Sequence, residues 1–181
     1  MFKEYVPICF AVKKCNVIYG RKKFQKMIYL SKELGIPFHE TFIWNNYGPY
    51  SEELAAEIDS LCKMEFLSED FDGLEYSYKI TQIGENFLDK SASEFNDIFQ
   101  YFEEILKILN EYESMQLEKL ASIKFLLNQG YDNSYINTFL NYSKNYSNDE
   151  IEKGKNMLSS LFKNLEEIKN GRKVEGLVQL V

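Results

Sequence analysis

Apolar residues near the start of the chain recur at the spacing of an α-helix. Between residues 21 and 34 the apolar positions are Phe24, Met27, Ile28 and Leu34. Residues three and four positions apart lie on one face of a helix, so this segment predicts an amphipathic helix. A glycine and a proline follow it, as is common after helix ends. A shorter helix is predicted over residues 3–15, with Val6 and Phe10 on one side.

The next segment carries signals for a turn, a second helix and a hairpin. Residues 38–44 are aromatic and β-branched and predict a short strand or an extended arm. After a turn at residues 45–49, Ser51 is a good N-cap for a helix that reaches about residue 64. That helix would bury Leu54, Ile58 and Leu61. Alternation of Tyr76, Tyr78 and Ile80 after an Asp-Gly turn predicts a β-hairpin, which would be the wing after a helix-turn-helix.

In the second half of the chain, the spacing of apolar residues predicts only helices. One apolar stripe contains Phe95, Ile98, Phe99, Phe102, Ile105, Leu106 and Leu109, and another helix contains Leu117, Leu120, Ala121 and Leu127. A capping-box pattern at residues 147–150 opens a last helix. The predicted fold is mainly α with a small β-hairpin wing. It comprises a winged-helix-like domain over residues 1–90, a helical extension over 91–170 packed on it, and a flexible tail over 171–181.

Charge is distributed unevenly along the chain. The net charge is −7, from 21 Lys and Arg and 28 Asp and Glu. Residues 1–50 hold eight basic and three acidic side chains, a net charge of +5. Residues 51–118 hold four basic and 18 acidic side chains, a net charge of −14. The acidic block would repel phosphate and attract a basic partner, whereas the basic block could attract phosphate.

Two segments are the candidate binding surfaces. The first is the basic helix, whose cations Arg21, Lys22, Lys23 and Lys26 are expected to be exposed and to matter little to stability. These cations either contact a partner or a phosphate backbone, or form an ordinary solvated helix face. The second is the turn at Tyr47 and Tyr50, followed by the acidic helix start at Glu52 and Glu53. The turn either has a structural role, in which its tyrosines pack within the protein and Ser51 caps the next helix, or it presents exposed aromatic rings to a partner.

Catalytic and metal chemistry find little support in the sequence. His39 is the single histidine, so a metal site would have to recruit carboxylates, and no Ser-His-Asp set can be assembled. Cys9, Cys15 and Cys62 lack metal-ligand spacing and are expected to be free thiols in a reducing cytoplasm. The sequence contains no phosphate-binding glycine loop. We therefore expect no catalytic residue, no metal and no cofactor.

These motifs resemble a known family. The stretch GRKKFQKMIYL at residues 20–30 and the stretch YGPYS at residues 47–51, with Leu54, are similar to those of YwgA-like proteins. More remotely, they resemble the SocA-like antitoxin domain called Panacea. The resemblance implies a winged-helix-like start followed by helices. For the SocA-like domain it also implies binding to a toxin and neutralising it, and it supplies no catalytic residue.

The leading hypothesis is a non-enzymatic adaptor or regulator, of the antitoxin kind, whose acidic surface binds a basic protein. The alternative is a transcriptional regulator that binds DNA through the basic N-terminal third. Ordinary major-groove reading is not expected, because the helix at residues 52–64 and the wing are acidic. No apolar stretch is long enough for a membrane span, so we expect a cytoplasmic protein. The oppositely charged blocks would also allow homo-oligomers.

Overall fold

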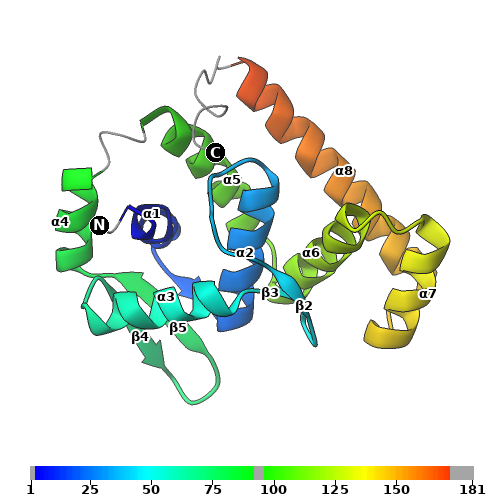
Figure 1. Cartoon of the computed structure of the whole chain (residues 1–181), viewed down its shortest axis with the longest axis horizontal. Helices are drawn as coiled ribbons and strands as arrows, with labels where there is room; N and C mark the ends of the chain where they lie inside the picture. The colour runs from blue at the N-terminus through cyan, green and yellow to red at the C-terminus, as the bar shows by residue number, and fades with distance from the viewer. Residues whose placement is uncertain (1–2, 92–95, 172–181) are drawn as a thin grey trace.

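The computed structural model describes residues 3–91 and 96–171, which form helices around a small sheet (Figure 1). The first part contains α1 (Tyr5–Cys15), β1 (Ile18–Tyr19), α2 (Arg21–Glu33), β2 (Ile43–Asn45), β3 (Gly48–Tyr50), α3 (Glu52–Lys63), β4 (Leu67–Phe71), β5 (Tyr76–Ile80) and α4 (Gln82–Ser91). The second part contains α5 (Asn96–Asn110), α6 (Ser114–Asn128), α7 (Asn133–Lys144) and α8 (Asn148–Gly171). The predicted fold class, mainly α with a small β-hairpin, is confirmed. Phe95 and all of the predicted tail beyond Gly171 lie outside the described residues.

The strands form two antiparallel groups. β5 lies between β1 and β4, with Ile80 opposite Leu67 and Tyr78 opposite Ile18. The β4–β5 pair is the hairpin that the alternating residues predict. β2 and β3 pair separately, so only the end of the segment at 38–44 is a strand. β1 has two residues, too few to show alternation in the sequence, and its pairing with β5 defines it.

Local capping explains where several helices begin. The Ser51 hydroxyl oxygen accepts a hydrogen bond from the Leu54 amide at 3.1 Å and caps α3, as predicted. At the start of α8, the Ser147 amide donates to a Glu150 carboxylate oxygen at 2.9 Å, and the Glu150 amide donates to the Ser147 hydroxyl at 3.3 Å. This is the predicted capping box. The sequence pattern did not single out α7, because only Ile136 and Leu140 of that helix are buried.

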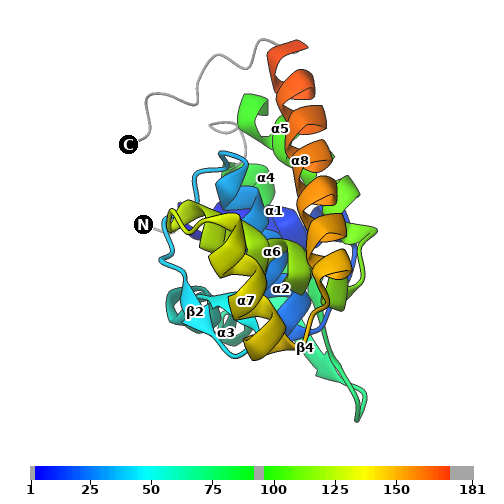
Figure 2. The ribbon, with the colours of Figure 1, turned by 90° about the vertical axis from the view of Figure 1, so that its right-hand side faces the viewer.

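α1 and α2 lie at the centre of the core. Residues 6–12 of α1 are all buried, because α3, α4, α5 and β5 pack around this helix. α6 packs against both α2 and β3, and α8 packs against α6 and α5 (Figures 1 and 2). The Phe10 ring stacks on the Phe99 ring with 4.0 Å between centroids, which joins α1 to α5. The hydrophobic core therefore continues across residue 90, and the division into domains stays a prediction.

Gly84 in α4 leaves no room for a side chain. A Cβ atom there would lie against the Phe66 carbonyl oxygen and 2.9 Å from Cγ1 of Ile80. Alanine is the better helix former by about 1 kcal/mol. We nevertheless expect Gly84→Ala to lower the free energy of unfolding by about 1–3 kcal/mol, because the backbone must move to admit the methyl group.

Urea denaturation measures this change. Gly171→Ala is the control, because among the described residues no atom outside the adjoining turn of α8 lies within 4 Å of the methyl group it adds. A Gly84→Ala protein as stable as the wild type would contradict the close packing of α4 on the loop before β4.

Candidate functional site

The basic helix α2 turns cations toward the protein interior. Phe24 and Met27 are buried, as predicted, but Lys26 is buried as well, with 1% of its surface exposed. Its ammonium group donates a hydrogen bond to the Pro49 carbonyl oxygen at 2.6 Å. Burial lowers the pKa of Lys26 to about 8. The prediction of an exposed basic face is wrong for Lys26, because β3 and α6 pack against α2.

A buried ion cluster attaches α2 to the second half of the chain. The carboxylate of Glu118 on α6, a residue that is 4% exposed, pairs with Lys22 at 2.9 Å and with Lys144 at 2.7 Å. Burial acts to raise the pKa of Glu118, but these two ion pairs outweigh it and hold the pKa below its ordinary value. Lys144 also donates to the Asn46 carbonyl oxygen. One carboxylate therefore links α2, α6, α7 and the β2–β3 turn.

The other two predicted cations, Lys23 and Arg21, also have partners within the chain, although the Arg21 side chain is 57% exposed, as predicted. Lys23 donates to the Asn110 carbonyl oxygen at 2.8 Å. The Arg21 guanidinium lies over the Tyr76 ring, 3.8 Å from its centroid. It donates to the Tyr78 hydroxyl and to Glu69, each at 3.1 Å. These hydrogen bonds raise the pKa of Arg21 above its ordinary value, so its charge is fixed. All four cations predicted as binding residues thus make intramolecular contacts.

The turn at residues 47–51 is mainly a structural junction. The Gln25 side-chain amide accepts from the Ser51 amide and donates to the Ser51 carbonyl oxygen, both at 2.9 Å. Gly48 has a φ of +78° and lies against the Ser122 hydroxyl, which favours glycine there. Tyr47 differs, because 64% of its surface is exposed and its ring centroid lies 5.4 Å from the Lys22 ammonium. Of the two predicted alternatives for this turn, packing within the protein applies to residues 48–51, and an exposed aromatic ring applies to Tyr47.

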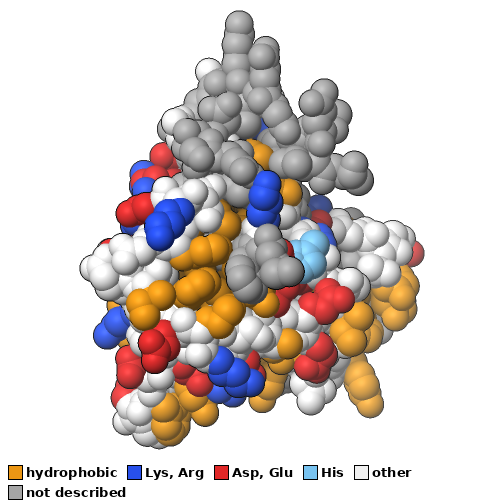
Figure 3. All heavy atoms as spheres, turned by 60° about the vertical axis from the view of Figure 1, so that its left-hand side comes forward, with side chains coloured by type: hydrophobic (Ala, Val, Ile, Leu, Met, Phe, Trp, Pro, Cys, Tyr) orange, Lys and Arg blue, Asp and Glu red, His pale blue; other side chains and the backbone are white. Residues whose placement is uncertain are grey.

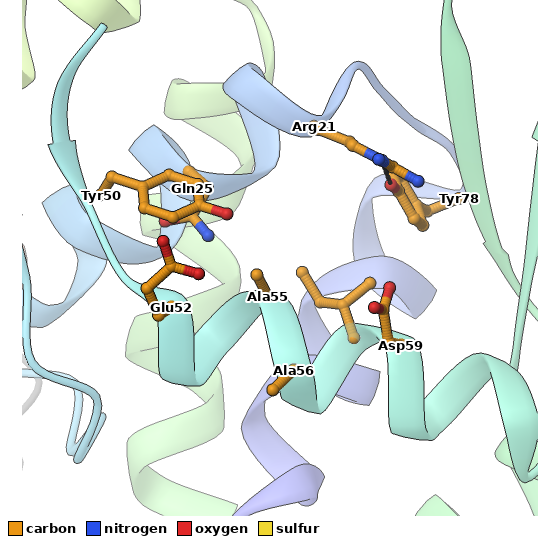
Figure 4. A pocket seen from close by; sticks show the side chains of 9 residues that line it. Arg21, Gln25, Tyr50, Glu52, Ala55, Ala56, Asp59 and Tyr78 are labelled. Atoms are coloured by element: carbon orange, nitrogen blue, oxygen red, sulfur yellow. Dashed lines mark hydrogen bonds between the residues drawn. The ribbon is translucent and has the colours of Figure 1, made fainter. Parts of the chain in front are cut away.

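A cavity of about 330 Å³ opens where α2 and α3 meet β5 (Figure 4). It is lined by Arg21, Gln25, Tyr50, Glu52, Ala55, Ala56, Ile58, Asp59 and Tyr78. Figure 4 shows Arg21 and Tyr78 at one end and Tyr50 and Glu52 at the other. Glu52 and Asp59 are exposed, and neither has an ion pair or hydrogen bond with another described residue. The charges of this cavity that have no counter-ion in the described part of the chain are therefore negative, and they belong to Glu52 and Asp59 of α3.

A second cluster, which the sequence did not reveal, lies where the loop after α2 meets α3. His39 Nε2 is 2.9 Å from a Glu57 carboxylate oxygen, and His39 Nδ1 is 3.9 Å from one of Glu40. Burial, contact with the Glu40 carboxyl and the negative charges of Glu4 and Glu53 raise the pKa of Glu57 to about 8. Glu53, a predicted binding residue, accepts a hydrogen bond from the Thr41 amide at 2.6 Å and holds this loop to α3. The adjacent positions of His39 and Glu40 in the sequence gave no indication that Glu57 would lie beside them in the folded chain.

Comparison with known proteins identifies a relative. No family model matches the chain. The chain is 35% identical over 129 residues to the "Uncharacterized protein YwgA" of Bacillus subtilis (strain 168), a match that covers 69% of this chain and 75% of that protein. The chain belongs to the YwgA-like family. The predicted family is therefore confirmed, whereas the remoter SocA-like resemblance stays a prediction. The name of the relative states no activity, so it assigns none to this chain.

The cysteines agree with a further expectation. Cys9, Cys15 and Cys62 are free thiols, as predicted. Burial raises the pKa of Cys9 to about 12 and that of Cys62 to about 11, which keeps both thiols protonated and poorly nucleophilic at neutral pH. None of the helices in the described part of the chain combines the length and the apolar composition needed to cross a lipid bilayer.

Lys26 provides a test of the inward-facing helix. We expect Lys26→Gln to lower the free energy of unfolding by about 1–3 kcal/mol, because the buried Pro49 carbonyl loses its donor. Lys163→Gln, on the exposed side of α8, is the matched control and should change stability by less than about 0.5 kcal/mol. Chemical denaturation compares the two variants. If they are equally stable, Lys26 does not make the buried contact.

Glu118 provides a test of the ion cluster. We expect Glu118→Gln to lower the free energy of unfolding by on the order of 3 kcal/mol, because two largely buried ammonium groups lose their shared counter-charge. Glu152→Gln removes the partner of Lys155 at a glutamate side chain that is 56% exposed, so it should leave the stability close to that of the wild type. Thermal unfolding of both variants at one ionic strength measures the contrast. Similar melting temperatures would mean that the cluster is solvated.

Proposed function

We propose that this protein is a non-enzymatic adaptor or regulator that binds a basic protein through the acidic face of α3. The observation that carries this proposal is the cavity between α2 and α3, where Glu52 and Asp59 present exposed carboxylates. Within the described chain these carboxylates lack a cation, whereas the cations of α2 are engaged internally. Complementary charge on a partner would supply the missing cation and orient the encounter.

The size and lining of the cavity suit a single lysine or arginine side chain. Its volume of about 330 Å³ is at the lower end of the range typical for binding pockets. Ala55 and Ala56 are small enough to leave the space open, and the Tyr50 ring can contact a cation. The β4–β5 hairpin next to α3 adds exposed carboxylates at Asp70 and Asp72, so a wider basic surface would be attracted as well.

The arrangement of the first part supports a winged-helix-like interpretation. The order is α1-β1-α2-β2-β3-α3-β4-β5, with β5 at the centre of the three-stranded sheet, and in a winged-helix interpretation α3 would be the recognition helix. Here, however, that helix and the adjoining hairpin carry carboxylates, each of which would weaken binding to phosphate. We therefore favour a protein partner, in keeping with the antitoxin role that the SocA-like resemblance implies, over DNA.

Affinity capture with a charge-matched pair of variants tests the proposal. The wild-type chain should retain a basic protein in stoichiometric amount from its native lysate at low salt. Glu52→Gln with Asp59→Asn should retain at least about tenfold less, because both carboxylates of the cavity are neutralised. Glu166→Gln with Glu167→Gln, which neutralises two exposed carboxylates on α8, should bind like the wild type.

Two results would contradict this function. One is a partner that both double variants retain equally, which would place the contact elsewhere. The other is a mobility shift of random duplex DNA at low salt together with no captured protein. That result would favour the DNA-binding alternative, because phosphate contacts are strongest at low salt.

A further inference from the structure

Three side chains of metal-ligand type converge between two elements that are separate in the sequence. His39 and Glu40 come from the loop between α2 and β2, and Glu57 comes from the middle of α3. One ligand atom from each residue lies within 4.8 Å of those of the other two. The chain's only histidine, pale blue in Figure 3, lies at the surface beside acidic side chains. The folded chain thus assembles one nitrogen ligand and two carboxylates at one point.

The Glu40 carboxylate is the decisive feature of this cluster. Glu40 is 0% exposed, and among the described residues neither of its carboxylate oxygens has a hydrogen-bond partner. The second carboxylate oxygen of Glu57 is buried and likewise has no partner in the described ranges. Lys32 approaches Glu40 but donates to its backbone carbonyl oxygen, at 2.7 Å. Burying a carboxylate without a hydrogen-bond donor or a cation costs free energy, and a second carboxylate beside it adds repulsion. A bound cation would offset both costs.

We propose that His39, Glu40 and Glu57 bind one divalent transition-metal ion of the Zn²⁺ class. Two carboxylates neutralise the charge of the ion, and a neutral imidazole adds a nitrogen ligand. Ligand atoms on a tetrahedral zinc ion, each about 2.0–2.2 Å from the metal, lie about 3.3–3.6 Å from one another. One ligand atom from each of His39, Glu40 and Glu57 already lies within 4.8 Å of the other two, so rotation of the exposed His39 ring and small shifts of the carboxylates would bring them to that separation.

The donor set distinguishes this ion from Mg²⁺ and Ca²⁺. Those ions favour oxygen ligands, and Mg²⁺ requires near-octahedral geometry, whereas an imidazole nitrogen favours zinc and its neighbours in the first transition row. The site is closed on one side by the buried Glu40 and open on the other, since 54% of the His39 side chain is exposed. Water or a partner's side chain can therefore complete the coordination from the solvent side.

Metal binding here would join the loop at residues 36–42 to α3. The hydrogen bond from the Thr41 amide to Glu53 already joins the same two elements one helical turn away. An ion between Glu40 and Glu57 would make this connection rigid and would stabilise the folded state in proportion to metal concentration. The residues differ from those that line the cavity on α3, so the site stands apart from the proposed partner-binding function.

Calorimetric titration of the full, chelator-treated chain with ZnCl₂ tests the proposal. We expect one Zn²⁺ per chain and a rise in melting temperature, with no comparable rise in Mg²⁺ or Ca²⁺ at equal concentration. His39→Ala changes an exposed side chain, and Glu40→Gln keeps the shape of a buried one. Each should weaken Zn²⁺ binding by about tenfold or more, and Glu167→Gln on α8 should leave it unchanged.

Two outcomes would overturn the site. Equal Zn²⁺ affinity in the wild type and in His39→Ala would place the metal elsewhere. If the wild-type chain binds no Zn²⁺ near neutral pH, Glu40 and Glu57 instead form a carboxyl pair that shares a proton. If Glu40→Gln does not fold, the comparison of the wild type with His39→Ala still decides between these results. Capture of a basic partner is measured separately, so failure of one proposal does not decide the other.

Discussion

The attachment of α2 to the β2–β3 turn and to α6 is the constraint on which the rest of the structure depends. Lys26 reaches a carbonyl oxygen in β3, Gln25 holds both backbone groups of Ser51, and Lys22 shares Glu118 with Lys144. Charged groups are stable in such a place only when their partners are positioned together. The turn, α6 and the end of α7 must therefore occupy one arrangement around α2.

This attachment also decides which charges remain available at the surface. Lys22, Lys23 and Lys26 are paired or hydrogen-bonded within the chain, and Arg21, although exposed, is paired with Glu69. These four cations are therefore not a set of free charges. Glu52 and Asp59 of α3 have no ion pair or hydrogen bond among the described residues, and both line the cavity. In a protein with a net charge of −7, this acidic face is the reason for proposing a basic protein rather than DNA as the partner.

α3 is the element that both proposals share. Its Glu52 and Asp59 line the cavity, while Glu57 belongs to the cluster with His39 and Glu40. Helical periodicity makes this division possible, because neighbouring residues of one helix point in different directions. The same helix can thus offer carboxylates to a partner at one face and to a metal ion at another.

The sequence by itself determined the elements whose signals are local. The apolar spacing of Phe24 and Met27, the Ser51 cap and the alternation before Ile80 each reflect contacts within a few residues, and the structure has α2, α3 and the β4–β5 hairpin where they indicate. The family also followed from local motifs. Only the tertiary structure decided that β1 pairs with β5, that Lys26 is buried, and that Glu57 meets His39 and Glu40. Each of these depends on segments far apart in the chain, and burial of a side chain is set by what packs against it rather than by its own hydrophobicity. For the same reason, the sequence pattern of α2 or of α3 alone does not predict the cavity between them.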